Sequence, residues 1–545
     1  MLKPRLLIVG TFITASLILT SCADSNSGGA GQSTLDIDFS KLATTTESGA
    51  GTVDRVTWNL PYEPLSLDPM HTFNYAENTV DANLCEGLTR LTPELTEENA
   101  LAESVANPDP QTYIYTIRDG VTFWDGSALT ADDVVYSLER QLGPGSTTYW
   151  TDYFLNVASV EKTADREVTI KLTQPDVLFA QAMSTAAGAI VSQSAAVAAG
   201  EAFGTPRGGL QCTGPFSLTS WEPGKAITLS KNPHYWDTDL IPLVEQISFS
   251  FIADETTAIN ALRSGDIDGQ YFYLPPAGLS QLNSDNTTTT YGKSYVFWTL
   301  RALQETGTFA QPEVRAALLA ALDRQAIADV VFQGAALPAP TLTGPDYFGS
   351  GPEAELFQEA LDSYNTDPDL DRARELLAQA GDISEPIVIA VQGSSAVHEQ
   401  TVNLIQAAGQ AIGLKIEIRV IPVEQYGNIY VDPKAREGLD GFLTTYYGNV
   451  PDPLDIYAIF TPGGAYNFTN YNQAGEFIEE ARQTLDPVAR AEPTIQAQEL
   501  VTRDLPWTPL NYMPNILVQN KRISGAAASI AYLSYPWAAT IGGQQ

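Results

Sequence analysis

The residue types that most often perform catalysis or bind metals are sparse in this chain and far apart in its sequence. The three histidines, His71, His234 and His398, form no i, i+4 pair and no spacing typical of a metal site. The sequence has neither a Gly-x-Ser-x-Gly nucleophile motif nor a glycine-rich loop of the kind that holds phosphate groups. We therefore expect no metal site, no cofactor and no catalytic residues among these residue types.

Paired carboxylates are the remaining candidates for chemistry, and they are too common here to identify a site. The chain has 65 acidic against 29 basic residues and a formal net charge of -36. A glycoside hydrolase that uses two carboxylates therefore stays open as an alternative function. A surface adhesin is a second alternative, although we find none of the internal repeats that would support it. Because so acidic a surface repels phosphate backbones, we expect no nucleic-acid partner.

The N-terminal residues have the pattern of an export signal rather than of a folded segment. Basic residues precede an apolar run over residues 6–19, which is shorter than the ~18 residues that span a bilayer. The run ends at residues 19–22, Leu-Thr-Ser-Cys, which resemble the lipobox of bacterial lipoproteins. That resemblance implies cleavage just before Cys22 and lipidation of its sulfur. An ordinary secretory signal is the alternative.

Residues 22–54 are rich in serine, glycine and threonine and contain few aromatic residues. Such a segment buries too little apolar surface to order itself, so we expect a flexible tether between the membrane and a globular body. No later stretch reaches the ~18 consecutive apolar residues of a transmembrane helix. We therefore expect the protein to be attached to the membrane by its lipid alone.

The first well-marked structural unit of the body is a predicted hairpin followed by a helix. Residues 113–117 alternate with the period of a strand, and an Asp-Gly turn leads to a second short strand over residues 121–124. Thr130 then lies three residues before Asp133, an arrangement typical of a capped helix start. This unit contains no chemistry of its own.

Two later stretches predict parallel sheets. Residues 247–269 and residues 387–420 each have the pattern of a strand, a helix and a second strand. Successive strands joined by a helix normally pair in parallel. At 545 residues the chain is too long for one core. We therefore expect two or three lobes, at least two of them of the α/β type.

Several motifs resemble those of one known family, the family-5 solute-binding proteins of ABC importers, which includes dipeptide, oligopeptide and nickel receptors. Residues 111–140 strongly resemble its signature. Residues 211–236 contain Gly-Pro-Phe, Trp-x-Pro-Gly and Asn-Pro-x-Tyr-Trp in the family's order. Residues 314–327 resemble the segment written roughly VRQALxxAIDRxAI, and residues 367–381 resemble a further helix of the family. The resemblance extends over residues 55–537.

The resemblance implies an α/β fold of the type II periplasmic-binding-protein class, with two α/β lobes joined by a hinge and a smaller lobe inserted in the first half. A solute binds between the two main lobes, which close on it. The expected divisions are a signal peptide (1–21), a tether (22–54), lobe I (55–90 and 209–292), the inserted lobe (91–208), lobe II (293–505) and a return to lobe I (506–545).

Two cysteines besides Cys22 lie beside family motifs of the first lobe. Cys85 directly precedes Glu-Gly-Leu, and Cys212 stands where the family usually has a glycine. In the oxidising compartment that the export signal implies, we expect these two residues to form a disulfide. Two separately buried thiols are the alternative.

The residues expected to meet the solute come from two segments that resemble family motifs. In the family, a Leu-Asp-Pro loop brings the chain to the cleft, and here residues 73–74 follow such a loop. Residues 445–453 resemble Gly-Trp-x-x-Asp-Tyr-x-Asp-Pro, whose first aspartate pairs with the ligand's ammonium in peptide receptors. The expected ligand-binding residues are Phe73, Asn74, Tyr446, Tyr447, Gly448, Asn449 and Asp452.

One position departs from the family's pattern. Asn449 aligns with the ammonium-binding aspartate, and burying an ammonium without a counter-charge is costly. Either another acid replaces the aspartate, with Asp452 and Asp455 as candidates, or the ligand has no free amino terminus. Peptide is the leading expectation because it is the family's commonest substrate. An oligosaccharide, an opine, and nickel or a metallophore stay open, and His71 beside Met70 is the only sequence support for nickel.

The resemblance therefore implies a lipid-anchored receptor outside the cytoplasm, on the outer face of the bacterial cell membrane or in the periplasm. It would deliver a small solute, a peptide in the first place, to the permease subunits of an ABC importer. We expect a monomer whose activity is binding with closure of its lobes.

Overall fold

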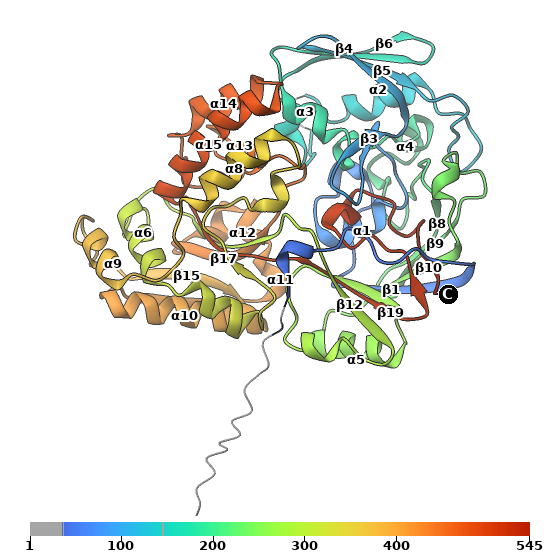
Figure 1. Cartoon of the computed structure of the whole chain (residues 1–545). Helices are drawn as coiled ribbons and strands as arrows, with labels where there is room; N and C mark the ends of the chain where they lie inside the picture. The colour runs from blue at the N-terminus through green and yellow to red at the C-terminus, as the bar shows by residue number, and fades with distance from the viewer. Residues whose placement is uncertain (1–34, 36, 144–145, 545) are drawn as a thin grey trace, which may run out of the picture. The chain divides into compact units, whose positions relative to one another are not determined.

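The computed structural model describes residues 35, 37–143 and 146–544, and Figure 1 shows them as two sheet-centred lobes with a smaller lobe beside them. The expected signal peptide and Cys22 lie outside the described residues, so both stay predictions. In the described ranges no helix is long and apolar enough to cross a membrane.

Lobe I is built on one mixed sheet. Its elements are β1 (Val53–Leu60), α1 (Tyr75–Asp81), β8 (Phe216–Glu222), β9 (Ala226–Lys231), β10 (Val244–Phe251), α5 (Glu255–Ser264), β11 (Gly269–Phe272), β12 (Thr287–Gly292) and β19 (Asn515–Asn520). The strand order is β12-β19-β11-β1-β10-β9-β8. The two strands predicted in residues 247–269, β10 and β11, run parallel as expected, but they do not pair with each other, because β1 lies between them and pairs with both. Asp254 caps the first turn of α5, and Gly265, at φ +84, ends the helix, so local residues set its length.

Lobe II has its own sheet, with the order β14-β18-β13-β17-β15-β16. Its strands are β13 (Phe297–Ala302), β14 (Leu337–Pro338), β15 (Ile387–Gln392), β16 (Ile416–Ile421), β17 (Gly441–Tyr446) and β18 (Trp507–Tyr512). Its main helices are α6 (Pro312–Ala321), α8 (Pro352–Asp362), α9 (Leu370–Leu377), α10 (Ala396–Ile412), α13 (Pro453–Ala458), α14 (Gly475–Gln483) and α15 (Pro487–Asp504). The pair β15 and β16 is parallel and is connected by α10, which confirms the second predicted unit.

The inserted lobe is an antiparallel sheet with helices on it, at the top of Figure 1. Its elements are β4 (Ala102–Asp109), β5 (Thr112–Ile117), α2 (Ala131–Glu139), β6 (Val157–Ala164), β7 (Glu167–Leu172), α3 (Val177–Ala182) and α4 (Gln193–Ala199). The predicted reciprocal cap between Thr130 and Asp133 begins α2. The predicted hairpin partner of β5 is wrong, because β5 pairs with β4 and β7 while Thr122 forms only an isolated bridge with Ala128.

The chain passes from lobe I to lobe II between β12 and β13, through residues 293–296, and returns between β18 and β19, through residues 513–514. The expected return at residue 506 is corrected by this finding. β18 pairs antiparallel with β13 and therefore still belongs to the sheet of lobe II. The sequence pattern of β18 does not reveal which sheet it joins, because its partner β13 is more than 200 residues away along the chain.

Residues 37–54 lie along the folded body, which corrects the expected tether over this part. The N–H of Ala43 donates to the carbonyl of Tyr291 (2.9 Å), and the N–H of Ala50 donates to the carbonyl of Gly543 (2.7 Å). Phe39 and Leu42 are partly buried. The polar composition of the whole segment conceals these few apolar residues, and backbone hydrogen bonds hold the segment against lobe I.

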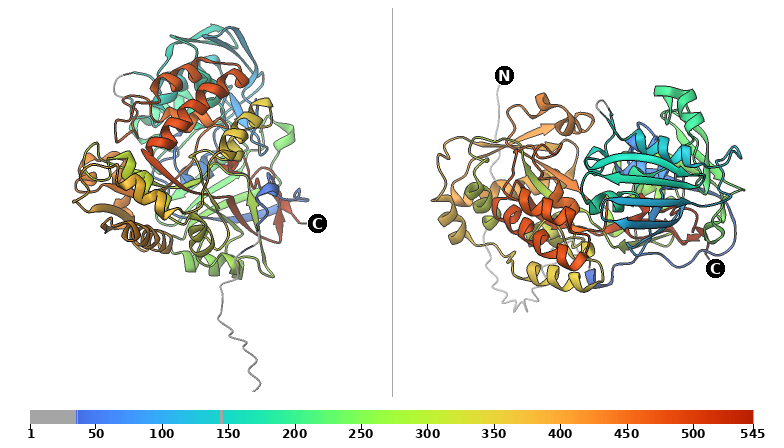
Figure 2. Two further views of the ribbon diagram at one scale, coloured as in Figure 1. Left: turned by 60° about the vertical axis from the view of Figure 1, so that its left-hand side comes forward. Right: turned by 90° about the horizontal axis from the view of Figure 1, so that it is seen from above.

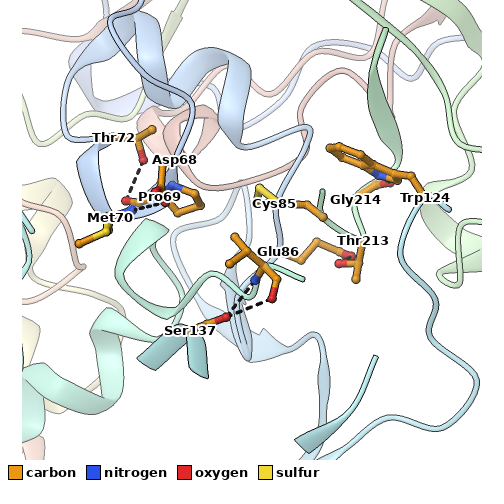
Figure 3. Close-up of a disulfide and its surroundings, with 12 residues drawn as sticks. Asp68, Pro69, Met70, Thr72, Cys85, Glu86, Trp124, Ser137, Thr213 and Gly214 are labelled. Carbon is orange, nitrogen blue, oxygen red and sulfur yellow. Dashed lines mark hydrogen bonds between the residues drawn. A yellow bond between two sulfur atoms is a disulfide. The ribbon is translucent and has the colours of Figure 1, made fainter. Parts of the chain in front are cut away.

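Cys85 and Cys212 form the predicted disulfide, with their Cα atoms 5.0 Å apart (Figure 3). The bond joins the loop after α1 to the segment before β8, close to where the chain leaves lobe I for the inserted lobe and where it returns. Glu86 supports the same junction, since its carboxylate accepts hydrogen bonds from Thr213 and Tyr235, both at 2.7 Å. The two ends of the insertion are therefore held together covalently and by buried polar contacts.

Lobe II contacts the inserted lobe directly. Helix α14 lies beside α3 (Figures 1 and 2), and Arg482 on α14 forms a buried ion pair with Asp176, the N-cap residue of α3, at 3.1 Å. We call this arrangement the closed form.

Candidate ligand-binding site

The segment after β17 lies where α/β sheets commonly bind ligands, at the carboxyl end of a central strand. β17 lies between β13 and β15 in the sheet of lobe II. Residues 446–449 leave the end of this strand and lead to α13, so the sheet holds them at the face of lobe II that meets the other lobes.

Two small cavities lie between lobe II and the opposite lobes, and Asn449 lines both. The first has a volume of about 20 Å³. It is lined by Tyr447 and Gly448 from lobe II and by Asn78 and Trp150 from the opposite side, among others. The sequence-predicted segment therefore lies at the lobe interface.

The second cavity, of about 40 Å³, brings aromatic and acidic side chains together. Tyr149, Asp152 and Tyr153 line it from the inserted lobe, and Tyr446, Asn449, Asp455, Tyr466 and Arg482 line it from lobe II. Ligand pockets usually have volumes of roughly 300–1,000 Å³. The lobes must therefore separate, or the aromatic side chains must move, before a solute can bind here.

A hydrogen-bond network crosses the interface at this second cavity. The hydroxyl of Tyr153 donates to Asp455 Oδ1 (2.6 Å), and the backbone N–H of Asn449 donates to Asp455 Oδ2 (2.7 Å). The Asn449 side-chain amide also donates to the Tyr153 hydroxyl (2.9 Å). Both oxygens of Asp455 thus have partners, but none of these partners carries a charge.

Burial raises the pKa of Asp455 to about 6, and its hydrogen bonds oppose that rise. The side chain is nearly inaccessible, with 6% of the residue exposed. Burial also raises the pKa of Asp152, and Arg482 opposes that rise. The closed form therefore holds acidic groups at the cavity in an environment that disfavours their ionised form.

Arg482 does not supply the missing positive charge to Asp455. Its guanidinium is paired with Asp176, whose own residue is fully buried, and it donates to the carbonyl of Asp152 (3.2 Å). The charge of Arg482 is thus compensated across the lobe interface, which leaves the cavity acidic.

Behind two of the tyrosines lies a fully buried arginine, Arg301 on β13. Its guanidinium lies 3.5 Å from the ring centroid of Trp507, and its Nη2 donates to the carbonyl of Tyr466 (3.0 Å). The rings of Tyr446 and Tyr466 lie within cation–π distance of it. Arg301 therefore positions the aromatic wall of the second cavity.

The structure brings together Tyr446, Tyr447, Gly448 and Asn449 of the predicted ligand-binding residues, at the two cavities. Phe73 lies at the edge of this region: its ring stacks on Tyr149 at 4.5 Å, and its carbonyl accepts a hydrogen bond from the Tyr447 hydroxyl (2.9 Å).

Asn74 and Asp452 do not line these cavities and instead serve helix starts. Asn74 is the N-cap of α1. Asp452 is the N-cap of α13 and forms an ion pair with Arg490 (2.9 Å), so its charge is already compensated. Of the two acids considered from the sequence, Asp455 is the one that meets the cavity.

Sequence reasoning missed the contributions of the inserted lobe and of α14. Tyr149, Asp152 and Tyr153 lie in an aromatic-rich stretch that resembles none of the motifs considered above, and Arg482 lies in an ordinary helix surface pattern. Aromatic density in residues 149–154 was the one local signal available.

Met70, one of the two residues considered for nickel, has another partner. Met70 Sδ accepts from the guanidinium of Arg140 at 2.9 Å, and Figure 3 shows Met70 beside Asp68 and Pro69. Within the described ranges, no group of three or more His, Cys, Asp or Glu side chains could hold a metal ion.

Two α/β lobes joined by crossing strands, with a site between them, define the class of two-lobed periplasmic binding proteins. The chain belongs to the bacterial extracellular solute-binding proteins, family 5, whose middle-region model matches residues 96–468. This is a family of non-enzymatic receptors that serve ABC importers, and the predicted fold class and family are thereby confirmed.

Curated relatives match over most of their length. The dipeptide-binding protein DppE of Bacillus subtilis is 25% identical, over 87% of this chain and 90% of that protein. The oligopeptide-binding protein OppA of the same bacterium is 24% identical, over 96% of this chain and 97% of that protein.

Solved structures share the fold. The periplasmic binding protein DppA of Helicobacter pylori, in complex with the peptide STSA, has a TM-score of 0.78 and 20% identity, covering 91% of this chain and 99% of that one. AgaA of A. tumefaciens R10, in complex with agropinic acid, has a TM-score of 0.76 and 21% identity, covering 90% of this chain and 99% of that one.

Proposed function

We propose that this protein captures a peptide with a free amino terminus and delivers it to the permease of an ABC importer. The observation that carries the proposal is Asp455, a buried carboxylate without a charged partner among the described residues, at a cavity lined by tyrosines from both sides. A ligand ammonium would supply the missing counter-charge. The tyrosines would give apolar contact area that tolerates varied side chains.

The same carboxylate would couple ligand charge to lobe closure. Closing the lobes without a ligand moves Asp455 out of water, which costs free energy while it stays ionised. An ammonium bound beside Asp455 offsets that cost, so closure is favoured when a suitable solute is present. Asn449 then contributes through its backbone N–H and its amide, not through a charge.

The relatives support the solute class. DppE and OppA are named for dipeptides and oligopeptides, and the H. pylori structure holds a peptide. A non-peptide solute is a second candidate, favoured by the amide at Asn449 and by the agropinic acid bound to AgaA.

We also propose lipid anchoring through Cys22 on the extracytoplasmic side of the cell membrane. The Leu-Thr-Ser-Cys sequence at residues 19–22 supports it. The anchor would keep the receptor near its permease.

The ligand proposal is tested with two probes that differ only in the amino terminus, Ala-Ala-Ala and N-acetyl-Ala-Ala-Ala. Calorimetry should detect binding of the free peptide and a large loss on acetylation. Native mass spectrometry of protein purified from its own host complements this test, because a co-purified solute without an amine would favour the second candidate.

A further inference from the structure

Residues 37–46 cross the boundary between the two main lobes, and we call them the hinge strap. They form the dark blue start of the described chain at the junction of the lobes in Figure 1. They run beside both connections between the lobes, residues 293–296 and residues 513–514.

The C-terminal half of the strap is bonded to lobe I through its backbone. The N–H of Ala43 donates to the carbonyl of Tyr291, and the carbonyl of Ala43 accepts from the N–H of Lys293 (3.0 Å). The carbonyl of Thr44 accepts from the N–H of Ala528 (2.8 Å). Because these bonds join the strap to β12 and to the chain beyond β19, it moves with lobe I.

Two apolar side chains of the strap, those of Phe39 and Leu42, face the other lobe and the hinge, whereas Ile37 packs on lobe I. Phe39 and Leu42 line a cavity of about 70 Å³ together with Leu337 and Tyr347 of lobe II. Val296 and Met513, at the two connections, line the same cavity, as does Tyr512 at the end of β18. The strap thus covers a largely apolar seam to which lobe II and both connections contribute.

Just before the strap, a further contact reaches the lobe II side. The N–H of Leu35 donates to the carbonyl of Gln333 (2.8 Å). The neighbouring Gly334 has φ +88, and a Cβ there would lie 2.5 Å from the Leu35 carbonyl oxygen, so glycine permits this close approach.

Hinge opening concentrates backbone rotation in the connecting residues and moves lobe II relative to lobe I. Since the strap backbone is bonded to lobe I, such a motion carries Leu337 and Tyr347 away from Phe39 and Leu42. These side chains therefore enclose the cavity together in the closed form and separate, at least in part, in the open form. Contacts that differ between two states shift the equilibrium between them.

We propose that the hinge strap regulates the receptor by holding the hinge in its closed arrangement. The inference rests on the proposed function, because it concerns closure of the same site. It does not depend on which solute binds or on whether Cys22 is lipidated.

The test compares the double variant Phe39→Ala/Leu42→Ala with Lys41→Ala/Thr45→Ala, a control at two exposed strap positions. Small-angle scattering of each protein without solute measures its radius of gyration. We expect the closed-to-open ratio of the double variant to fall about tenfold, because two large apolar side chains lose their partial burial. The radius of the double variant should then exceed that of the wild type, and the control should match the wild type.

Equal radii for the double variant and the wild type would overturn the proposal, as would an equal increase in the control. Circular dichroism checks that the variant is folded; if the double variant does not fold, Phe39→Ala and Leu42→Ala are measured singly against the same criterion. A wild type that binds neither peptide probe would refute the proposed peptide ligand. The scattering measurement would still test the strap, because it is made without solute.

Discussion

Replacing Asp455 by asparagine tests the proposed link between ligand charge and lobe closure. An ammonium placed about 3–4 Å from this carboxylate gains roughly 4–6 kcal/mol at an effective dielectric constant of about 20. Against this, raising the Asp455 pKa from 3.8 to about 6 corresponds to about 3 kcal/mol against the ionised form in the closed protein. The difference, about 2 kcal/mol, predicts that Asp455→Asn weakens binding of Ala-Ala-Ala roughly 30-fold.

Calorimetry at pH 7.5 with both peptide probes isolates the charge interaction. The wild type should prefer the free peptide to the acetylated one, and Asp455→Asn should lose most of that preference, as in a double-mutant cycle. Asparagine keeps the shape of the side chain but has only one acceptor oxygen, so it loses either the bond from Tyr153 or the bond from the Asn449 N–H. That loss is common to both peptides and cancels when their affinities are compared. If the variant retained the full preference for the free amino terminus, Asp455 would not be the ammonium partner.

The same variant should change the pH dependence of closure without solute. A carboxyl whose pKa is higher in the closed form binds its proton more tightly there, so protonation favours closure. This contribution is complete below the ordinary pKa near 3.8 and is lost as the pH rises through about 6. The unliganded wild type should therefore become more compact as the pH falls from 7 to 5. Asp455→Asn should weaken that trend, with Asp152 supplying part of the remainder.

Three further predictions concern stability and attachment. Asp452→Asn leaves Arg490 buried without its counter-charge and should lower the free energy of unfolding by about 3–5 kcal/mol in urea titrations, with little change in peptide preference; an unchanged midpoint would contradict this role. Replacing Cys85 and Cys212 by serine opens a loop with a sequence separation of 127 and should cost about 4–5 kcal/mol. Free thiols in the denatured, unreduced mature protein would exclude the bridge. Cys22→Ala should move the protein from the membrane fraction to the soluble fraction and remove the lipid mass, and unchanged retention would rule out this anchor.

Local features of the fold could be predicted because nearby residues determine them. The capping residues Thr130 and Asp133 are three positions apart, and their reciprocal hydrogen bonds form wherever the helix lies. The full pairing of β5 could not be predicted in the same way, because one of its two partners, β7, lies more than 50 residues further along the chain. A turn signal such as Asp119-Gly120 indicates that the chain reverses, but it does not indicate which strand pairs with the strand before the turn.

In the candidate site, too, local features could be predicted and long-range contacts could not. The segment around Tyr446 and Asn449 was found from a motif, whereas the choice between Asp452 and Asp455 depends on Arg490, which lies on a helix far along the chain. Composition also misled at the N-terminal segment. The surrounding polar residues dominate the average composition of this segment. A few apolar residues spaced along it, including Phe39 and Leu42, nevertheless contribute to where it lies.

The disulfide at the two ends of the inserted lobe makes that lobe a closed covalent loop on the rest of the chain. A protease that cuts one peptide bond between Cys85 and Cys212 would leave a single covalent molecule, because the bridge still joins the two fragments. Local unfolding within the loop would likewise leave its ends fixed in lobe I, where Thr213 donates a hydrogen bond to Glu86. Insertions, deletions and exchanges of whole segments should therefore destabilise the protein less in the inserted lobe than in lobe I. The residues that the inserted lobe contributes to the ligand site are accordingly the ones that recombination can change most readily.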